Sequence, residues 1–220
     1  MSLDKNPLLN KNNEALSLTP VDFIRMFNNL GRIMVSAPDL YEAGKSADSE
    51  IIKSLQKDLK ESWIVTSTRI HYEDGLEGTI THYFGSDIIS PCEKKVVIPY
   101  YNRTFLNDVL EDEQGLAYLQ ALFNTDDNSG NIKETLKKLS NKAASKTKIW
   151  TPSQDSRKNT SDRALRLCYF DVEFLVDGDV LVVNYLGRSR GVLENPLGVA
   201  HENIVRETSK ELKYSPDLIS

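Results

Sequence analysis

The 220-residue chain has little cysteine and no long apolar run, and both shortages narrow the class of protein. Its two cysteines, Cys92 and Cys168, lie far apart in the sequence, so free structural thiols are expected rather than a disulfide framework. No apolar stretch approaches the roughly 20 residues that a membrane helix needs, and the N-terminus lacks the apolar core of a signal peptide. We therefore expect a soluble, cytoplasmic protein that does not interact with membranes.

Motifs that would identify a catalytic mechanism are also scarce. Residues 187–191 read Gly-Arg-Ser-Arg-Gly, the string of a hydrolase nucleophile elbow, but Pro196 interrupts the helix that must follow such a serine. His71 and His82 lie on neighbouring predicted strands. Two histidines on a solvent-facing ribbon explain them better than a zinc site, because the spacing of a compact zinc module is missing. No cofactor is predicted.

The composition is that of one folded domain with a loose N-terminal end. Hydrophobic residues make up 40% of the chain and charged residues 27%, which is ordinary for a globular protein. Residues 1–18 are rich in Asn, Lys and Ser and show no helical or strand period, so they are predicted to form a flexible N-terminal arm. Residues 19–215 are predicted to form a single α+β domain.

The strongest local signal is a β-hairpin predicted at about residues 165–187. Two runs rich in β-branched and aromatic residues flank Asp177-Gly178, and an Asp-Gly pair is typical of a two-residue type I′ turn. Counting outward from this turn fixes the register and one core-facing side of the ribbon. The residues predicted on that side are Phe170, Val172, Phe174, Leu181, Val183 and Tyr185.

A second hairpin is predicted at about residues 64–84, with short strands near 88–89 and 96–98 at the sheet edges, where prolines interrupt them. A loop is predicted over 36–48. Apolar periodicity and capping residues predict helices over about 19–34, 48–63, 104–123, 132–143 and 196–212. The 104–123 stretch is weakened in the middle by Gln114-Gly115, so two short helices fit it as well as one. The predicted fold is α+β: an antiparallel β-sheet, built from the two hairpins and the short edge strands, with helices packed on one face.

Charge is segregated along the chain, although the net charge is only −5. Six acidic residues and no basic residue lie from Asp108 to Asp127. Ten basic and three acidic residues lie from 133 to 166, a local balance of 10 − 3 = +7. The part of that segment from 145 to 163 has no period and is predicted to be a long polar loop. The acidic stretch can neutralise the basic segment within the chain or across an oligomer interface.

Three functions fit these patterns, and the favoured one is not enzymatic. It is a cytosolic protein that acts by self-association, as a homo-oligomer, or by binding a protein partner. This hypothesis rests on the lack of a convincing catalytic constellation, on the charge segregation, and on the half-apolar reverse face of the 165–187 hairpin, which is suited to a contact surface. No enzyme activity is favoured.

The second hypothesis is a divalent-metal-dependent phosphodiester or phosphate hydrolase. Asp171 and Glu173 are two residues apart on a predicted strand, so both carboxylates leave the same face, where Mg²⁺ or Mn²⁺ finds oxygen ligands. Asn184 is predicted opposite them. Arg188 and Arg190 follow closely and can hold a phosphate group. Alternating polar residues on a half-exposed hairpin face explain the same pattern.

The third hypothesis is nucleic-acid or nucleotide binding through the basic segment 133–166. Lysines and arginines there can contact a phosphate backbone while Trp150 stacks on a base. A solvated lysine face followed by a loop accounts for the same residues, and the chain is acidic overall, so nucleic acid is not the favoured partner. The candidate binding residues of all three hypotheses are Asp171, Glu173, Asn184, Arg188, Arg190, Trp150, Arg157 and Lys158.

Overall fold

A computed structural model of the chain describes residues 2–9, 12, 14–46, 48–73, 75–159, 162–180 and 187–193. Helices pack against a mostly antiparallel, curled sheet, and the predicted α+β class is confirmed. The helices are α1 (Pro20–Asn29), α2 (Ala37–Lys45), α3 (Ser49–Glu61), α4 (Leu106–Glu111), α5 (Glu113–Phe123), α6 (Ser129–Ser140) and α7 (Gln154–Asn159), with a 3-10 helix at Ala144–Lys146. None of the described helices is long and apolar enough to cross a membrane.

The main sheet has seven strands in the order β5-β4-β3-β8-β9-β7-β6. They are β3 (Ile64–Tyr72), β4 (Glu77–His82), β5 (Cys92–Val97), β6 (Thr104–Phe105), β7 (Thr147–Trp150), β8 (Asp162–Phe170) and β9 (Glu173–Val180). Neighbouring strands run antiparallel except β7 and β9, which are parallel. The hairpin predicted near 64–84 is β3–β4, in which Ile70 lies opposite Ile80.

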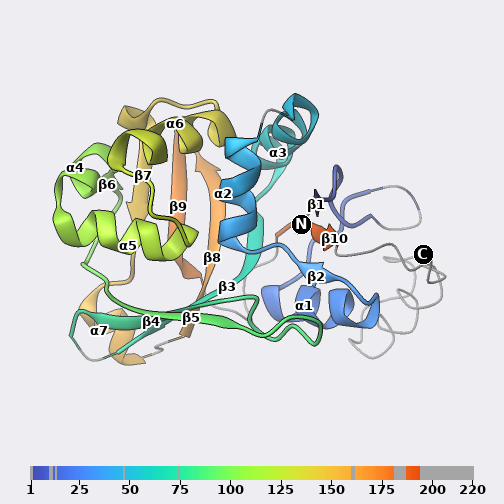
Figure 1. The fold of residues 1–220 in the computed structure, drawn as a ribbon, viewed down its shortest axis with the longest axis horizontal. Helices are drawn as coiled ribbons and strands as arrows, with labels where there is room; N and C mark the ends of the chain where they lie inside the picture. The colour runs from blue at the N-terminus through green and yellow to red at the C-terminus, as the bar shows by residue number, and fades with distance from the viewer. Residues whose placement is uncertain are drawn as a thin grey trace.

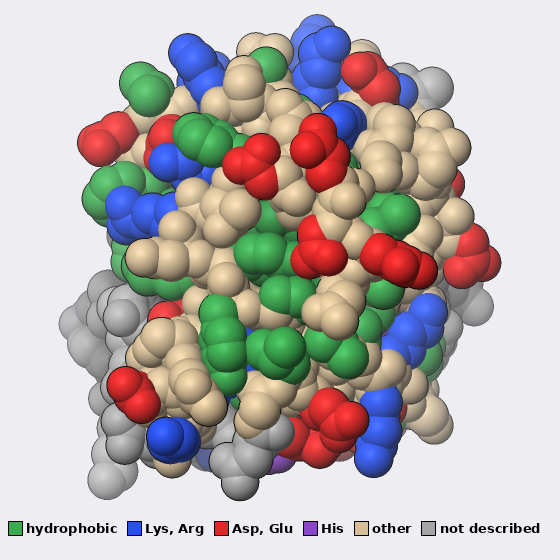
Figure 2. Space-filling view, turned by 90° about the vertical axis from the view of Figure 1, so that its left-hand side faces the viewer, with side chains coloured by type: hydrophobic (Ala, Val, Ile, Leu, Met, Phe, Trp, Pro, Cys, Tyr) green, Lys and Arg blue, Asp and Glu red, His purple; other side chains and the backbone are tan. Residues whose placement is uncertain are grey.

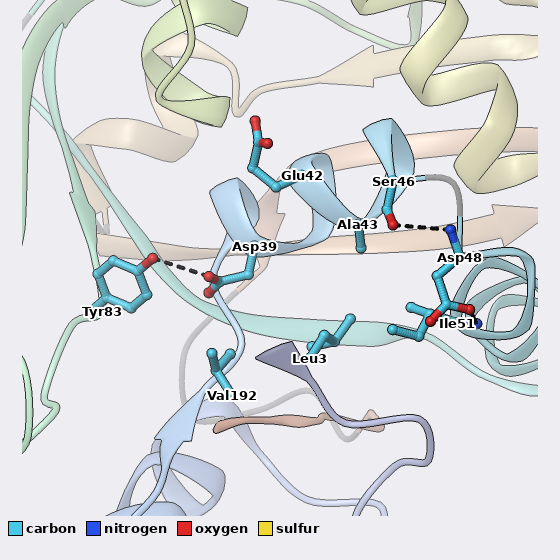
Figure 3. Close-up of a pocket in the computed structure, with 9 residues that line it drawn as sticks. All are labelled: Leu3, Asp39, Glu42, Ala43, Ser46, Asp48, Ile51, Tyr83 and Val192. Atoms are coloured by element: carbon cyan, nitrogen blue, oxygen red, sulfur yellow. Dashed lines mark hydrogen bonds between the residues drawn. The ribbon is translucent and has the colours of Figure 1, made fainter. Parts of the chain in front are cut away.

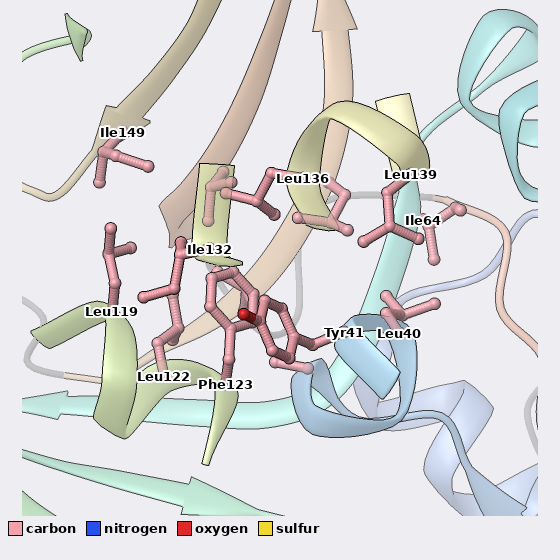
Figure 4. Close-up of a cluster of buried hydrophobic side chains, with 14 of the residues drawn as sticks. Leu40, Tyr41, Ile64, Leu119, Leu122, Phe123, Ile132, Leu136, Leu139 and Ile149 are labelled. Carbon is pink, nitrogen blue, oxygen red and sulfur yellow. The ribbon is translucent and has the colours of Figure 1, made fainter. Parts of the chain in front are cut away.

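The main core lies between this sheet and the helical layer made by α2, α4, α5 and α6 (Figure 1). Each of these helices is amphipathic, so its apolar stripe is buried against the sheet while its charged face meets solvent. Tyr41 of α2 stacks on Phe123 of α5 with their ring centroids 4.8 Å apart. The close-up in Figure 4 shows the cluster built from Leu40, Tyr41, Ile64, Leu119, Leu122, Phe123, Ile132, Leu136, Leu139 and Ile149.

A smaller three-stranded sheet lies at the other end of the molecule, in the order β1-β10-β2 (Figure 1). Its strands are β1 (Ser2–Leu3), β2 (Ile33–Met34) and β10 (Gly191–Leu193). Residues predicted to form a flexible arm contribute β1 and bury Leu8, Leu16 and Leu18 beside α1. These leucines show no sequence period because each one packs against a different part of the fold. Their burial therefore cannot be predicted from periodicity alone.

Helix α2 lies where a loop was predicted over 36–48. Ser36 caps the helix, and the Asp39 carboxylate accepts a hydrogen bond from the Ser36 backbone N–H at 2.8 Å, which completes a capping box with Pro38 in the first turn. The preceding helix α1 is correspondingly shorter than predicted. It ends at Asn29, and the chain turns at Gly31, whose φ is +62°.

The turn predicted for the 165–187 hairpin, Asp177-Gly178, is wrong. The described part of this hairpin is β8–β9, and its two-residue turn is Asp171-Val172, with Asp171 at φ +55°. The corrected register pairs Phe170 with Glu173 and Tyr169 with Phe174. Phe174 remains in the core as predicted, but Phe170 and Val172 are exposed. Leu181, Val183 and Tyr185 lie outside the described residues, as does the predicted helix over 196–212.

Gly178 lies inside β9 because another part of the core packs against its backbone. A Cβ atom there would be 2.9 Å from the hydroxyl oxygen of Tyr72 and 3.2 Å from that of Tyr118. The Tyr72 hydroxyl donates a hydrogen bond to the Gly178 carbonyl at 2.9 Å. Asp177 is buried and pairs with Arg166 across the ladder. The Asp-Gly pair therefore reflects close packing and a buried ion pair rather than a turn.

The long polar loop predicted over 145–163 is also wrong. Its first part forms β7, where Ile149 points into the core while Lys148 and Trp150 face the other way. Its second part contains α7. A four-residue strand is too short to produce a recognisable alternation, and its parallel neighbour β9 is distant in sequence, so this element depends on tertiary pairing.

His82 is fully buried, which corrects its predicted place on a solvent-facing ribbon. Its Nδ1 lies 3.2 Å from the hydroxyl oxygen of Thr68, and its Nε2 lies 3.1 Å from the carbonyl oxygen of Ala121. Because that carbonyl only accepts, Nε2 carries the proton and Nδ1 accepts from Thr68. The Thr68 hydroxyl oxygen also accepts from the Ala37 backbone N–H, so this chain of bonds joins α2, the sheet and α5.

We predict that Gly178→Ala lowers the free energy of unfolding by about 1–3 kcal/mol, because the added methyl group must displace tyrosine oxygens that are packed in the core. Chemical denaturation measures the change. Gly130→Ala is the comparison variant: it lies in the exposed first turn of α6, where the added Cβ atom would be 3.2 Å from the Oδ1 atom of Asn128, and the expected change is within about 1 kcal/mol. An unchanged denaturation midpoint for Gly178→Ala would contradict the close contact.

Burial lowers the pKa of His82 to about 4, with the hydrogen bond to Ala121 opposing the shift. Between the unfolded value of 6.5 and this folded value the unfolded chain binds a proton that the folded chain does not. Stability therefore falls as the pH is lowered through this window, by an amount of order 3 kcal/mol. We predict that His82→Gln flattens the pH dependence of unfolding between pH 6.5 and 4 relative to wild type. Equal slopes for wild type and His82→Gln would contradict this assignment.

Candidate functional site

Aromatic and cationic side chains gather where β6, β7 and the β8–β9 turn meet. Phe105 lies opposite Lys148 in the β6–β7 ladder, and Lys148 pairs with Glu173 at 2.8 Å next to the turn. Lys148 Nζ also lies 4.6 Å from the centroid of the Phe105 ring. We call this region the Arg103 surface, and its members are Arg103, Phe105, Lys148, Trp150, Phe170 and Val172.

Arg103 is held between two aromatic rings. Its guanidinium carbon lies 4.7 Å from the centroid of the Trp150 ring and 4.1 Å from that of the Phe170 ring. Both distances are within the range of a cation–π interaction. Stacking occupies the flat faces of the guanidinium group and leaves its N–H donors at the edge. Arg103 forms no ion pair with any described carboxylate, so these donors have no anionic partner within the described chain.

The backbone at Arg103 is also unusual. Its φ is +53°, in the left-handed region that non-glycine residues rarely adopt. Such a conformation costs of order 1–3 kcal/mol and persists where surrounding contacts impose it, often at binding sites. The strain therefore supports a functional reading of the Arg103 position.

The Arg103 surface exposes large apolar side chains to solvent. Phe105 is 40% exposed, Phe170 is 48% exposed and Val172 is 61% exposed. Aromatic residues and arginine are the types enriched at protein interfaces, while lysine and glutamate are depleted there. Exposed large apolar side chains gathered near an arginine are typical of a contact surface.

A group of carboxylates lies beside this surface, on α4 and at the start of α5. We call it the acidic corner, and its members are Asp108, Glu111, Asp112 and Glu113, all of them exposed. Asp112 accepts a hydrogen bond from the Tyr101 hydroxyl at 3.1 Å, and the four form no ion pair with a described residue. Figure 2 shows one side of the molecule, on which acidic side chains lie above and beside a group of hydrophobic side chains near the middle.

The proposed metal pair does not share a strand face. Asp171 lies in the β8–β9 turn and is exposed, while Glu173 begins β9 and pairs with Lys148. Asn184 lies outside the described residues. Within the described part of the chain no three His, Cys, Asp or Glu side chains are grouped so that they could hold a metal ion.

Arg188 and Arg190 lie against α3 and pair with Asp58. We call these three residues the clasp. Arg190 is 1% exposed and pairs with Asp58, which also accepts from Arg188 at 3.5 Å. Arg190 Nη1 donates to the carbonyl oxygens of Asp4 at 2.9 Å and Lys5 at 2.5 Å. Burial lowers the pKa of Arg190, and the Asp58 carboxylate opposes that shift. The clasp ties the N-terminal residues to α3 and β10.

The remaining basic candidates are largely occupied by internal contacts. Arg157 is buried, donates to the carbonyl oxygens of Pro152 and Pro99, and stacks on Tyr72 and Tyr100. Lys158 is exposed, 3.7 Å from Asp155 of the same helix. Of the sequence-based candidates, the structure thus brings Trp150 and Glu173 to the Arg103 surface, with Asp171 in the adjoining turn.

Ser189, the central residue of the Gly-Arg-Ser-Arg-Gly string, is 1% exposed. Its hydroxyl donates to the Val65 carbonyl oxygen at 3.1 Å. A nucleophilic serine must present its oxygen to a substrate, so this buried hydroxyl has a structural role.

A pocket of about 480 Å³ lies between α2, α3 and the small sheet (Figure 3). Three carboxylates line it, but two of them cap helices: Asp39 accepts from Ser36 and Tyr83, and Asp48 accepts from the first backbone N–H groups of α3. Glu42 lies 3.3 Å from Lys45. The polar groups of this pocket are therefore committed to holding the helices in place.

Arg103 and Phe105 were not among the sequence-based candidates. A local signal is present, because residues 100–105 read Tyr-Tyr-Asn-Arg-Thr-Phe, with aromatic residues interleaved with a cation. Their importance becomes visible only when β7 and the β8–β9 turn, both distant in sequence, lie beside them.

No protein-family model, curated protein or solved structure matches this chain.

We predict that Arg190→Ala lowers the free energy of unfolding by about 3–5 kcal/mol, because Asp58 is left buried without its main partner. Hydrogen exchange at Leu3 and Asp4 should accelerate as β1 loses its anchor. Lys158→Ala is the control, with a change within about 0.5 kcal/mol for an exposed lysine. A loss below about 1 kcal/mol for Arg190→Ala, within the range of ordinary substitutions, would show that the clasp is not a structural anchor.

Proposed function

We propose that this protein is a non-enzymatic, cytoplasmic binding protein whose contact surface is the Arg103 surface. The observation that carries the proposal is the stacked Arg103 guanidinium, which has no anionic partner among the described residues and lies against the exposed ring of Phe170 and the half-buried ring of Trp150. A fixed guanidinium presents paired N–H donors that match the two oxygens of a carboxylate. The partner is accordingly a protein surface on which a carboxylate adjoins apolar side chains.

The contact chemistry combines two favourable terms. Burial of the exposed rings removes apolar surface from water, which contributes about 25 cal/mol per Å². A carboxylate that accepts hydrogen bonds from Arg103 in an interface without water adds a charge-assisted hydrogen bond worth about 1.5–3 kcal/mol. Arg103 is immobilised by Trp150 and Phe170 before a partner arrives, so little side-chain entropy is lost on binding.

The nucleic-acid alternative receives less support from the contacts of segment 133–166. Several of its cations are paired internally: Arg163 with Asp179 at 2.9 Å, Arg166 with Asp177 at 2.8 Å, and Lys148 with Glu173. Phosphate binding needs several free cations along one track. The metal-hydrolase alternative loses its shared strand face, because Asp171 lies in the turn.

The test uses N-acetyl-phenylalanine as a minimal probe with one carboxylate and one ring. We predict saturable shifts of the Trp150 indole N–H signal in a nitrogen–proton NMR spectrum, while the Trp63 indole signal remains in place. The amide of the same probe, which lacks the carboxylate, should bind about tenfold more weakly, as expected for the loss of a charge-assisted bond.

Arg103→Gln should reduce the affinity for N-acetyl-phenylalanine about tenfold, to the level of the amide probe. Lys158→Gln is the matched control, because it removes a cation outside the Arg103 surface and should leave the titration unchanged. Equal binding of the acid and the amide, or an unperturbed Trp150 signal, would contradict the proposal.

A further inference from the structure

We infer that the partner of the Arg103 surface is a second copy of this chain, bound through its acidic corner. This inference rests on the proposed function and adds the identity of the partner. Its basis is charge complementarity: Arg103 lacks an anion and the acidic corner lacks a cation among the described residues, and the two are joined by β6 and the start of α4.

Residue Phe105 connects the two regions. It belongs to β6 beside Lys148 on the Arg103 surface, and it is also the N-terminal flanking residue of α4. Asp108 and Glu111 follow on that helix. An exposed aromatic ring therefore lies at the boundary between a cationic area and an acidic area.

This arrangement suits a twofold symmetric contact. Such an interface uses the same patch of both copies. If a residue of the first copy contacts a different residue of the second copy, the reverse contact between the same two positions also forms. With the axis near Phe105, Arg103 of each copy faces the acidic corner of the other. Both charge contacts then form at once, and the exposed rings of Phe105 and Phe170 pack together at the centre.

Within one copy the same charges do not neutralise each other. The rings of Trp150 and Phe170 hold the Arg103 guanidinium in place, and the acidic corner is carried by α4 and the start of α5, which pack on the core through Leu106 and Val109. Both groups are on rigid supports, so they remain available to another molecule.

The inference predicts a concentration-dependent dimer that weakens as salt is added, because screening acts on the charge contacts. A purely apolar contact would be maintained or strengthened by salt such as sulfate. Sedimentation velocity over a wide concentration range, at low and high ionic strength, measures both properties on the full-length protein.

The decisive experiment reverses the charges on one side at a time. Arg103→Glu removes the unpaired cation and places a carboxylate in both regions, and the triple variant Asp108→Lys, Glu111→Lys, Glu113→Lys leaves the acidic corner with three cations and one carboxylate. Each variant alone should dimerise at least tenfold more weakly than wild type. An equimolar mixture of the two should recover dimers, because each region again meets the opposite charge. Lys158→Glu is the control and should dimerise like wild type. Circular dichroism of each variant checks folding, and recovery in the mixture itself requires folded chains.

Each outcome separates the inference from the function on which it rests. A wild-type chain that stays monomeric at every concentration, while N-acetyl-phenylalanine still shifts the Trp150 signal, overturns the second copy and leaves the binding surface standing. A dimer that Arg103→Glu does not weaken places the contact elsewhere and also overturns the inference. A monomer whose Trp150 signal responds only to a single-stranded oligonucleotide overturns both, because it assigns the surface to nucleic acid.

Discussion

The buried ion pair between Arg166 and Asp177 fixes the part of the sheet on which the candidate surface depends. The two residues face each other across β8 and β9 at 2.8 Å, and Asp177 is almost completely buried. Burial raises the pKa of Asp177, and the Arg166 guanidinium opposes that shift. A slip of register would leave the charge of Asp177 or Arg166 buried without its partner, at a cost of about 3–5 kcal/mol. The pair therefore places the turn at 171–172 and brings Phe170 beside Arg103.

Local sequence signals predicted an element correctly wherever a few adjacent residues determine its structure. Thr19 and Asp48 cap α1 and α3 as predicted, and the β3–β4 hairpin follows from its β-branched runs. Gly178 shows why other elements were mispredicted: a glycine suits both a turn and a close tertiary contact, and only the packed Tyr72 distinguishes the two. The candidate site was recognised only in part for a similar reason, because the aromatic partners of Arg103 come from distant strands.

The folded chain uses the charges of the basic segment and of the acidic stretch in different ways. Cations of the basic segment are largely used inside the molecule, in pairs such as Arg163 with Asp179 and Lys148 with Glu173. The first part of the acidic stretch, which forms the acidic corner, has no such partner among the described residues. The cation nearest to the acidic corner in sequence is Arg103, which lies outside the basic segment, and the exposed ring of Phe105 lies between the two. An interface is the arrangement that satisfies both the Arg103 surface and the acidic corner and covers the ring.

The central claim is that one copy contacts another through these two areas, and cross-linking tests it most directly. A mixture of nitrogen-14 and nitrogen-15 labelled protein is treated with a carbodiimide, which joins a lysine to a carboxylate only in direct contact. With the Arg103→Lys variant, we expect mixed-isotope links between position 103 of one copy and the 108–113 carboxylates of the other, with the Lys148–Glu173 link inside each copy as an internal standard. Only single-isotope links, or mixed links confined to other surfaces, would contradict this claim.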